Sequence, residues 1–231
     1  MTRCLATLLV LSASSSSAAD WLGTAGQQPH ESVLSPSNVH QLQLIWTYKL
    51  AASPSTPPLI LGRWVTNRGT KELLLIGAGK TIYAIDADLG RLFWKRELPD
   101  QPACIGMAPL PPITSTDDED DDEPQDLRPL IVRSAEGRLV ALHPTDGRDI
   151  PLPPKASCDT RSHEQVIANG VTWSLKGKLL KAADTSTGRL LYSSKALVKT
   201  ASATGIAIAN GHVCFGTTDG TLYCFGFPVD Q

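Results

Sequence analysis

Apolar residues occur along this chain in short runs that are separated by turn residues. Leu59–Leu61 and Leu73–Ile76 are two such runs, and Ile82–Ile85 follows a glycine-rich turn. Asn-Gly and Asp-Gly pairs, which tight hairpin turns favour, stand at 169–170, 210–211 and 219–220. No segment keeps the 3.6-residue period of an amphipathic helix over several turns. The pattern therefore predicts an all-β fold.

One pattern recurs four times: a short apolar strand containing a small residue, then a polar or small position, and in three copies a Gly-Arg turn. The copies begin at 82, 139, 180 and 222, so the spacings between them are 57, 41 and 42 residues. They read IYAIDADLGRLFW, LVALHPTDGRDIP, LKAADTSTGRLLY and LYCFGFPVD. A period near 42 built from short β segments is typical of propeller blades. We predict a β-propeller of about four four-stranded blades.

The fourth repeat lacks a fourth strand, and a segment near the N-terminus can supply one. Within Leu44–Lys49, Trp46 is placed much as Trp94 is placed in the outer strand of the first repeat. An added strand would remove an exposed sheet edge. We expect Leu44–Lys49 to pair beside Leu222–Phe225, so that the N-terminal strand closes the last blade.

Three aromatic residues, Trp46, Trp94 and Tyr192, stand at equivalent outer-strand positions of the repeats. An aromatic box for a ligand is one interpretation. Docking between adjacent blades explains the repetition better, because large aromatic side chains dominate core packing. We therefore interpret these residues as blade-docking aromatics.

The repeats resemble the tryptophan-docking repeats of pyrroloquinoline quinone (PQQ) propellers, whose usual blade reads LYALDAxTGxLLW. Asp20-Trp21, Gly26, Ser35–Val39 and Trp46–Tyr48, with Leu42 and Leu44, resemble the N-terminal segment of quinoprotein dehydrogenases. Together the two resemblances cover nearly all of the chain after residue 19. The resemblance implies a propeller in an exported protein and makes PQQ with calcium the cofactor to consider.

This chain departs from the quinoprotein pattern in ways that matter for function. The family closes about eight blades around PQQ and calcium, whereas four repeats are present here. The adjacent cysteine pair of its alcohol dehydrogenases is missing, and no residue matches its calcium-ligating Glu and Asn or its catalytic Asp. Asp86 and Asp184 end repeat strands, where a carboxylate fixes a turn through bonds to the backbone. We therefore assign no catalytic, cofactor-binding or metal-ligating residue.

The first nineteen residues have the layout of a secretory signal peptide. Arg3 supplies a positive start, Cys4–Leu11 is a short apolar run, and Ser17–Ala19 is a small-residue cleavage site. The apolar run is too short to span a bilayer, so no transmembrane anchor is predicted. We expect an exported, periplasmic or extracellular protein with a signal peptide at 1–19 and one propeller domain at 20–231.

Charge is concentrated in one acidic run. The 231 residues have a formal net charge of −2, which argues against a nucleic-acid partner. Asp117–Glu123 is a run of seven consecutive acidic residues. Without these seven and Asp126, the rest of the chain would have a formal charge of +6. The run lacks the glycine and the closing glutamate of an EF-hand, and packed like charges repel. We interpret 115–127 as a solvated loop inserted into the first, longer repeat spacing.

Four cysteines remain after the predicted cleavage: Cys104, Cys158, Cys214 and Cys224. An even number in an oxidising compartment permits two disulfides, and free buried cysteines are the alternative. With a three-residue turn at 218–220, Cys214 lies opposite Cys224, close enough for a bridge. Cys104 and Cys158 both precede the first strand of a repeat, which would place them in comparable loops of neighbouring blades.

Two further motifs are weaker. Gly77–Thr81 lacks the first glycine of a phosphate-binding loop and is followed by a β segment, so we interpret it as a hairpin turn. The five histidines show no metal-ligand spacing and accompany no serine nucleophile motif. His143 takes the repeat position of Asp86, which predicts a turn role. The five are His30, His40, His143, His163 and His212.

Three functional hypotheses follow. The first is a non-catalytic exported propeller that binds a protein or a small-molecule ligand at its loops, as many propellers do. The second is a PQQ-dependent alcohol or sugar dehydrogenase in which two four-blade chains pair as a homodimer. The third is a truncated relative without independent activity. We favour the first because the blade pattern is intact while the family's catalytic residues are not matched.

Overall fold

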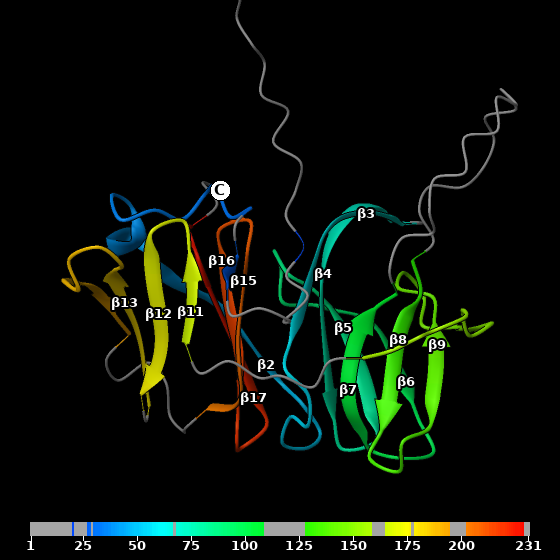
Figure 1. Ribbon diagram of the computed structural model, residues 1–231. Helices are drawn as coiled ribbons and strands as arrows, with labels where there is room; N and C mark the ends of the chain where they lie inside the picture. The colour runs from blue at the N-terminus through cyan, green and yellow to red at the C-terminus, as the bar shows by residue number, and fades with distance from the viewer. Residues whose placement is uncertain are drawn as a thin grey trace, which may run out of the picture.

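The computed structural model describes residues 20, 27–28, 30–66, 68–108, 128–158, 165–176, 178–194 and 202–228. These residues form four β-sheets and one short 3-10 helix, η1, at Val39–Gln41 (Figure 1). Within this part of the chain, no helix is long and apolar enough to cross a bilayer.

Each sheet contains four antiparallel strands, which come from one repeat in three sheets and from the last repeat and the N-terminal segment in the fourth, so the all-β propeller-type prediction is confirmed. Blade 1 is β3 (Leu59–Thr66), β4 (Gly69–Ala78), β5 (Thr81–Asp86) and β6 (Leu92–Glu97). Blade 2 is β7 (Pro102–Met107), β8 (Leu130–Ser134), β9 (Leu139–Leu142) and β10 (Asp149–Ile150). Blade 3 is β11 (Gln165–Ala168), β12 (Val171–Lys176), β13 (Leu179–Asp184) and β14 (Leu190–Ser193), with β1 (Gln27–Gln28) added in parallel beside β11. Blade 4 is β15 (Ser202–Ala209), β16 (His212–Thr217), β17 (Thr221–Gly226) and β2 (Gln43–Lys49).

The N-terminal strand closes the last blade, as predicted. β2 runs antiparallel to β17, with Trp46 opposite Cys224 and Tyr48 opposite Leu222. The interpretation of Gly77–Thr81 as a hairpin turn is confirmed as well, because residues 79–80 form the tight turn between β4 and β5.

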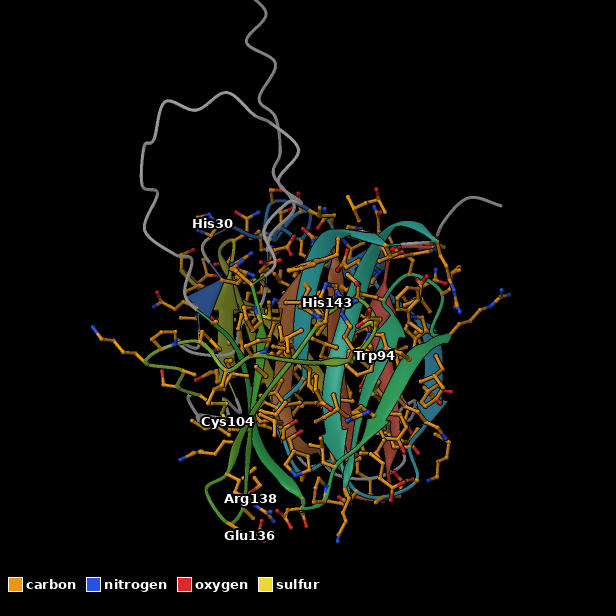
Figure 2. The ribbon with its side chains drawn as sticks, turned by 90° about the vertical axis from the view of Figure 1, so that its right-hand side faces the viewer. His30, Trp94, Cys104, Glu136, Arg138 and His143 are labelled. Carbon is orange, nitrogen blue, oxygen red and sulfur yellow. A yellow bond between two sulfur atoms is a disulfide. The ribbon has the colours of Figure 1, made fainter. Side chains whose placement is uncertain are left out.

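The strands define two faces of the molecule. The turns between first and second strands and between third and fourth strands lie on what we call the upper face, and those between second and third strands on the lower face. Figure 2 shows His143 toward the upper face, with Glu136 and Arg138 at the lower face. The end of β7 and the start of β8 lie at the upper face.

The blades are packed as an arc in the order 3, 4, 1, 2 (Figure 1). Alternate residues of β4 face opposite neighbours: Leu74 packs in a core shared with blades 4 and 3, and Leu75 packs in a core shared with blade 2. Among the described residues, no comparable packing joins blade 2 to blade 3. Blades 2 and 3 are therefore the two ends of the arc.

The free face of blade 2 is covered by the chain that follows it. Ile150 packs with Ile131 and Ala141, and Ala156 and Cys158 lie over the same cluster. A Cys104–Cys158 disulfide ties this segment down. The expectation that Cys104 lies in a loop is wrong: it lies inside β7, because the inner strand of blade 2 begins at Pro102.

The free face of blade 3 is partly polar. Residues of β12 and β13 alternate between fully buried positions, such as Trp173, and more exposed ones, such as Ser174 and Lys181. By contrast, β4 is buried without interruption from Leu73 to Ala78. A strand buried on both faces lacks alternation, so blade 3 has the pattern of an end blade.

Several predictions concern residues outside the described part of the chain. These are the signal peptide at 1–19, the acidic insertion at 115–127, and Trp21 and Gly26 of the N-terminal segment. The domain boundaries therefore stay predictions.

Candidate functional site

In each of the first three blades, a polar side chain at the end of the third strand caps the upper-face turn that follows it. Asp86 Oδ1 accepts hydrogen bonds from the backbone N–H groups of Asp88 and Leu89, at 3.2 and 3.1 Å. Asp184 Oδ1 accepts from Ser186 and Thr187, at 2.9 Å each. The Ser186 hydroxyl and the Thr187 backbone lower the pKa of Asp184 to about 2.

His143 replaces the aspartate in blade 2 with a ring nitrogen. Its Nδ1 lies 2.9 Å from the Thr145 hydroxyl and 3.4 Å from the Thr145 backbone nitrogen. Burial lowers the pKa of His143, which favours the neutral ring that can accept these bonds. Asp86, His143 and Asp184 thus have the turn geometry that the repeat suggested.

The three docking aromatics occupy equivalent positions on the outer strand, each paired with a residue of the third strand. Trp46, Trp94 and Tyr192 lie opposite Cys224, Ala84 and Ala182, and each pair is followed by an irregularity in the ladder. The small partners leave room for a large side chain on the outer strand.

Trp46 and Trp94 each contact the upper turn of the next blade. Trp46 donates its indole N–H to the carbonyl of Ala87 at 2.7 Å, and Trp94 donates to Pro144 at 2.9 Å. The ring of Trp46 lies against Gly90, where an added Cβ would come within 2.5 Å. Tyr192 instead meets Phe225 of blade 4 edge-on, with 6.4 Å between ring centroids. These contacts are structural, since each aromatic side chain packs against or hydrogen-bonds to a residue of the neighbouring blade.

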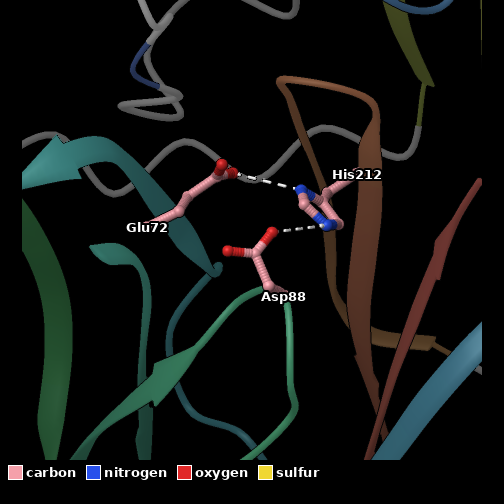
Figure 3. Close-up of side chains that lie close together, drawn as sticks. All are labelled: Glu72, Asp88 and His212. Carbon is pink, nitrogen blue, oxygen red and sulfur yellow. Dashed lines mark hydrogen bonds and ion pairs between the residues drawn. The ribbon is translucent and has the colours of Figure 1, made fainter. Parts of the chain in front are cut away.

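The most chemically varied group of side chains lies on the upper face between blades 4 and 1. His212 begins β16, Glu72 lies near the start of β4, and Asp88 lies in the turn after β5 (Figure 3). His212 Nδ1 is 3.2 Å from Glu72 Oε1, and His212 Nε2 is 3.6 Å from Asp88 Oδ1. Two carboxylates from blade 1 therefore address both ring nitrogens of one histidine from blade 4.

Burial sets the electrostatics of this group. The side chains of Glu72 and His212 are 10% and 12% exposed, whereas Asp88 is 55% exposed. Burial raises the pKa of Glu72 against the opposing hydrogen bond from His212. Burial alone would lower the pKa of His212, but Glu72, Asp88 and Glu31 outweigh it and raise that pKa. Glu72 and His212 therefore hold their protons more strongly than isolated side chains would.

Glu31 connects this group to the N-terminal segment. Its Oε1 accepts from the backbone N–H groups of Val33 and Leu34, at 2.7 and 2.9 Å, and its Oε2 accepts from Gly211 at 3.3 Å. Only 4% of Glu31 is exposed. Bonds to a charged carboxylate are among the stronger hydrogen bonds, so Glu31 fixes the backbone beside His212.

A shallow cavity of about 290 Å³ lies where blades 1 and 2 meet. It is lined by Arg68, Phe93, Trp94, Thr145 and Asp146. The Arg68 guanidinium lies 5.1 Å from the centre of the Phe93 ring, within cation–π range. This cavity offers both charge signs and an aromatic wall.

Asp20 and Gln28 of the N-terminal segment contact several blades. Asp20 Oδ1 accepts from the backbone of Gly62 in blade 1 at 2.8 Å, and its Oδ2 pairs with Arg128 beside blade 2 at 3.0 Å. Gln28 donates to Asp20 and to Ile208 of blade 4, while β1 pairs with blade 3. Asp20 and residues 27–28 thus contact blades 1, 3 and 4 and the residue Arg128 beside blade 2.

No cysteine belongs to the Glu72–Asp88–His212 group among the described residues. Cys214 and Cys224 form a disulfide across β16 and β17, in the register that a three-residue turn predicts. Sequence reasoning missed Glu72 and Asp88 and assigned no role to His212. The three residues come from opposite ends of the repeat series, so no local spacing could have revealed them.

The four-stranded repeats, with an outer-strand aromatic docked on the turn of the next blade, define the class of PQQ-type β-propeller repeat proteins. A family model described as outer membrane protein assembly factor BamB matches residues 38–226, which include every strand from β2 to β17. The chain belongs to this family. A comparison with curated protein sequences found no significant match.

Solved structures show only distant similarity. A quinohemoprotein alcohol dehydrogenase from Comamonas testosteroni is 16% identical, with 76% of this chain and 27% of that chain covered and a TM-score of 0.35. BamB from Moraxella catarrhalis is 14% identical over 80% of this chain and 61% of that chain, with a TM-score of 0.25. The computationally designed Ika4 protein is 14% identical over 80% and 98%, with a TM-score of 0.30. This chain spans about a quarter of the dehydrogenase and about three fifths of BamB.

Proposed function

We propose that this chain is an exported, non-catalytic propeller that binds a protein partner through its upper-face loops. The observation that carries the proposal is the match to the BamB family, which spans all four blades. The name of that family describes an assembly factor, a role that consists of binding other proteins.

The upper face has the apolar side chains that a protein contact uses. Val65 is the last residue but one of β3, next to the first upper turn of blade 1. Leu89 lies in the second upper turn, and Val33 lies beside the turn at Gly211. They are 64%, 54% and 44% exposed. Exposed apolar groups among polar ones are typical of interaction surfaces.

Export is supported by two observations. The structure contains two disulfides, which persist in oxidising compartments. The sequence predicts a signal peptide at 1–19. We place the protein in the periplasm or outside the cell.

A PQQ-dependent alcohol or sugar dehydrogenase built from two paired chains is the second candidate. It is favoured by the N-terminal resemblance at Ser35–Val39, which is ordered by Asn38: its Oδ1 accepts from Ser35 at 2.8 Å and its Nδ2 donates to Val33 at 2.7 Å. Pairing would require the free faces of blades 2 and 3 to meet those of a second chain. The covered face of blade 2 and the polar face of blade 3 favour a monomer instead.

Position-specific photocrosslinking in the producing cell tests the proposal. A photoreactive residue at Leu89 or Val65 should give one adduct of defined mass, and the same residue at Glu136 on the lower face should not. Leu89→Asp should abolish the adduct formed from Val65. Titration with PQQ and calcium, followed by dye reduction with alcohols and sugars, covers the second candidate. Cofactor binding with turnover would overturn the scaffold proposal.

A further inference from the structure

We propose that His212, Asp88 and Glu72 form a binding site for a divalent first-row transition metal ion, Zn²⁺ above all, that joins blade 4 to blade 1. In this site His212 Nε2 and Asp88 are ligands, and Glu72 orients the imidazole through Nδ1. The site is independent of the proposed protein-binding function.

The spacing of the donor atoms fits an ion between them. His212 Nε2 and Asp88 Oδ1 are 3.6 Å apart, which is longer than a hydrogen bond. Two ligands of a tetrahedral zinc ion, each about 2.1 Å from the metal, are about 3.4 Å apart. A small movement of the half-exposed Asp88 side chain therefore satisfies the geometry.

Glu72 fixes the orientation of the imidazole. Its carboxylate lies 3.2 Å from Nδ1, and both side chains are largely buried. A histidine ligand commonly donates its other N–H to a carboxylate, which sets the tautomer and makes the free nitrogen a better donor. With Nδ1 facing Glu72, the other ring nitrogen, Nε2, faces Asp88 (Figure 3).

The local charge favours a cation. Glu72 and Asp88 lie on the two nitrogens of one histidine, Glu31 binds the adjacent Gly211 backbone, and the neighbouring Lys71 is paired with Asp86 at 3.0 Å. Among the described residues, Glu72, Asp88 and His212 also make up the one group of three metal-ligating side chains, with donor atoms within 4.8 Å of one another. A divalent ion at Nε2 would add positive charge beside the carboxylates of Asp88 and Glu72.

The donor set selects the kind of metal. One imidazole nitrogen with carboxylate oxygens suits zinc and its first-row neighbours, whereas magnesium and calcium prefer oxygen alone. Asp88 is 55% exposed, so solvent can reach the site and water can complete the coordination. The two ligands belong to different blades, so binding should stiffen the packing between them.

The test is metal titration of the chelator-treated full chain. Isothermal calorimetry with Zn²⁺ and visible absorption with Co²⁺ should report one site per chain, with weaker binding of Mg²⁺ and Ca²⁺. Asp88→Asn, at an exposed position, should weaken Zn²⁺ binding at least about tenfold because it removes a ligand charge. His212→Gln should abolish the Co²⁺ spectrum. His143→Gln is the matched control, since His143 has one carboxylate nearby, and it should bind as the unchanged chain does.

Two results would overturn the proposal. The first is Zn²⁺ affinity that is unchanged in both Asp88→Asn and His212→Gln, which would place binding elsewhere, such as the acids of 117–123. The second is no saturable Zn²⁺ binding by the folded, unchanged chain. Loss of partner crosslinking with intact Zn²⁺ binding would count against the proposed function alone.

Discussion

The junction between blades 4 and 1 and the gap between blades 2 and 3 use the same turn motif with opposite results. At the junction, the turn from Asp86 to Gly90 holds the indole of Trp46. At the gap, the equivalent turn of blade 3 is capped just as well by Asp184, but among the described residues no neighbouring atom lies within 4 Å of a Cβ added to Gly188. A well-formed docking turn therefore does not by itself bring two blades together.

The two sites differ in the outer-strand side chain that the preceding blade presents to the turn. Blade 4 presents Trp46, whereas blade 2 has Ile150 at the corresponding register position, opposite Ala141. Ile150 is already packed under the segment that ends at Cys158. The chain thus covers the free face of blade 2 itself, in the way that end repeats of stacked proteins shield their outer surfaces.

The largest expected effect on stability comes from removing the disulfide that holds the segment after Ile150 over the free face of blade 2. We expect the double substitution Cys104→Ala with Cys158→Ala to lower the free energy of unfolding by about 4 kcal/mol, because the disulfide closes a loop of 54 residues. The matched double substitution at Cys214 and Cys224, with a separation of 10 residues, should cost about 1.4 kcal/mol less. Urea unfolding measures both. Equal losses would argue against the chain-entropy explanation.

The next effect compares the two turns directly. Gly90 and Gly188 have positive φ angles of 65° and 69°, so alanine is strained at both. Gly90→Ala also brings a Cβ within 2.5 Å of Trp46, so we expect about 3 kcal/mol of destabilisation there and about 1 kcal/mol for Gly188→Ala. Thermal or urea unfolding gives the difference. A greater loss at Gly188 would mean that another side chain occupies the blade 3 turn.

A smaller effect tests whether an aromatic alone can close the gap. We expect Ile150→Trp to cost about 1 kcal/mol through overpacking against Ile131. The radius of gyration from small-angle X-ray scattering should not change, because the covering segment still separates blade 2 from blade 3. A more compact molecule would show that the missing tryptophan is the whole cause of the gap.

The smallest effect is in the pH dependence of the turns. The pKa of His143 is lowered in the folded state, so its contribution to stability is present above its unfolded value of 6.5 and is lost as the pH falls below it. The pKa of Asp184 is lowered to about 2, so its contribution is lost only as the pH falls from 3.8 through about 2. His143→Asp should therefore reduce the loss of stability just below pH 6.5, as measured by urea unfolding across pH. An unchanged profile would contradict the turn role of His143.

Much of the fold could be predicted because its signals are local. The repeat period, the hairpin turns and the Cys214–Cys224 register all depend on residues close together in sequence. The end-blade character of blade 3 was not predicted, although it has a local signal: VTWSLK in β12 alternates while LLLIGA in β4 does not.

The gap and the Glu72–Asp88–His212 group could not be predicted in the same way. His212 meets Glu72 only because the N-terminal strand completes blade 4 and blade 4 packs on blade 1, which brings together residues 140 positions apart. The cover on blade 2 depends likewise on where the segment after Ile150 folds, and repeat spacing says nothing about that.

The central claim is that neither end blade needs a second chain, because the free face of blade 2 is covered by its own chain and the free face of blade 3 is partly polar. Light scattering coupled to size-exclusion chromatography, over a wide range of concentrations, tests it most directly. We predict the mass of a single chain at every concentration, because blade 2 is covered and blade 3 presents a polar face. A stable species of twice that mass, formed by the unchanged protein, would contradict the account and support a ring of two chains.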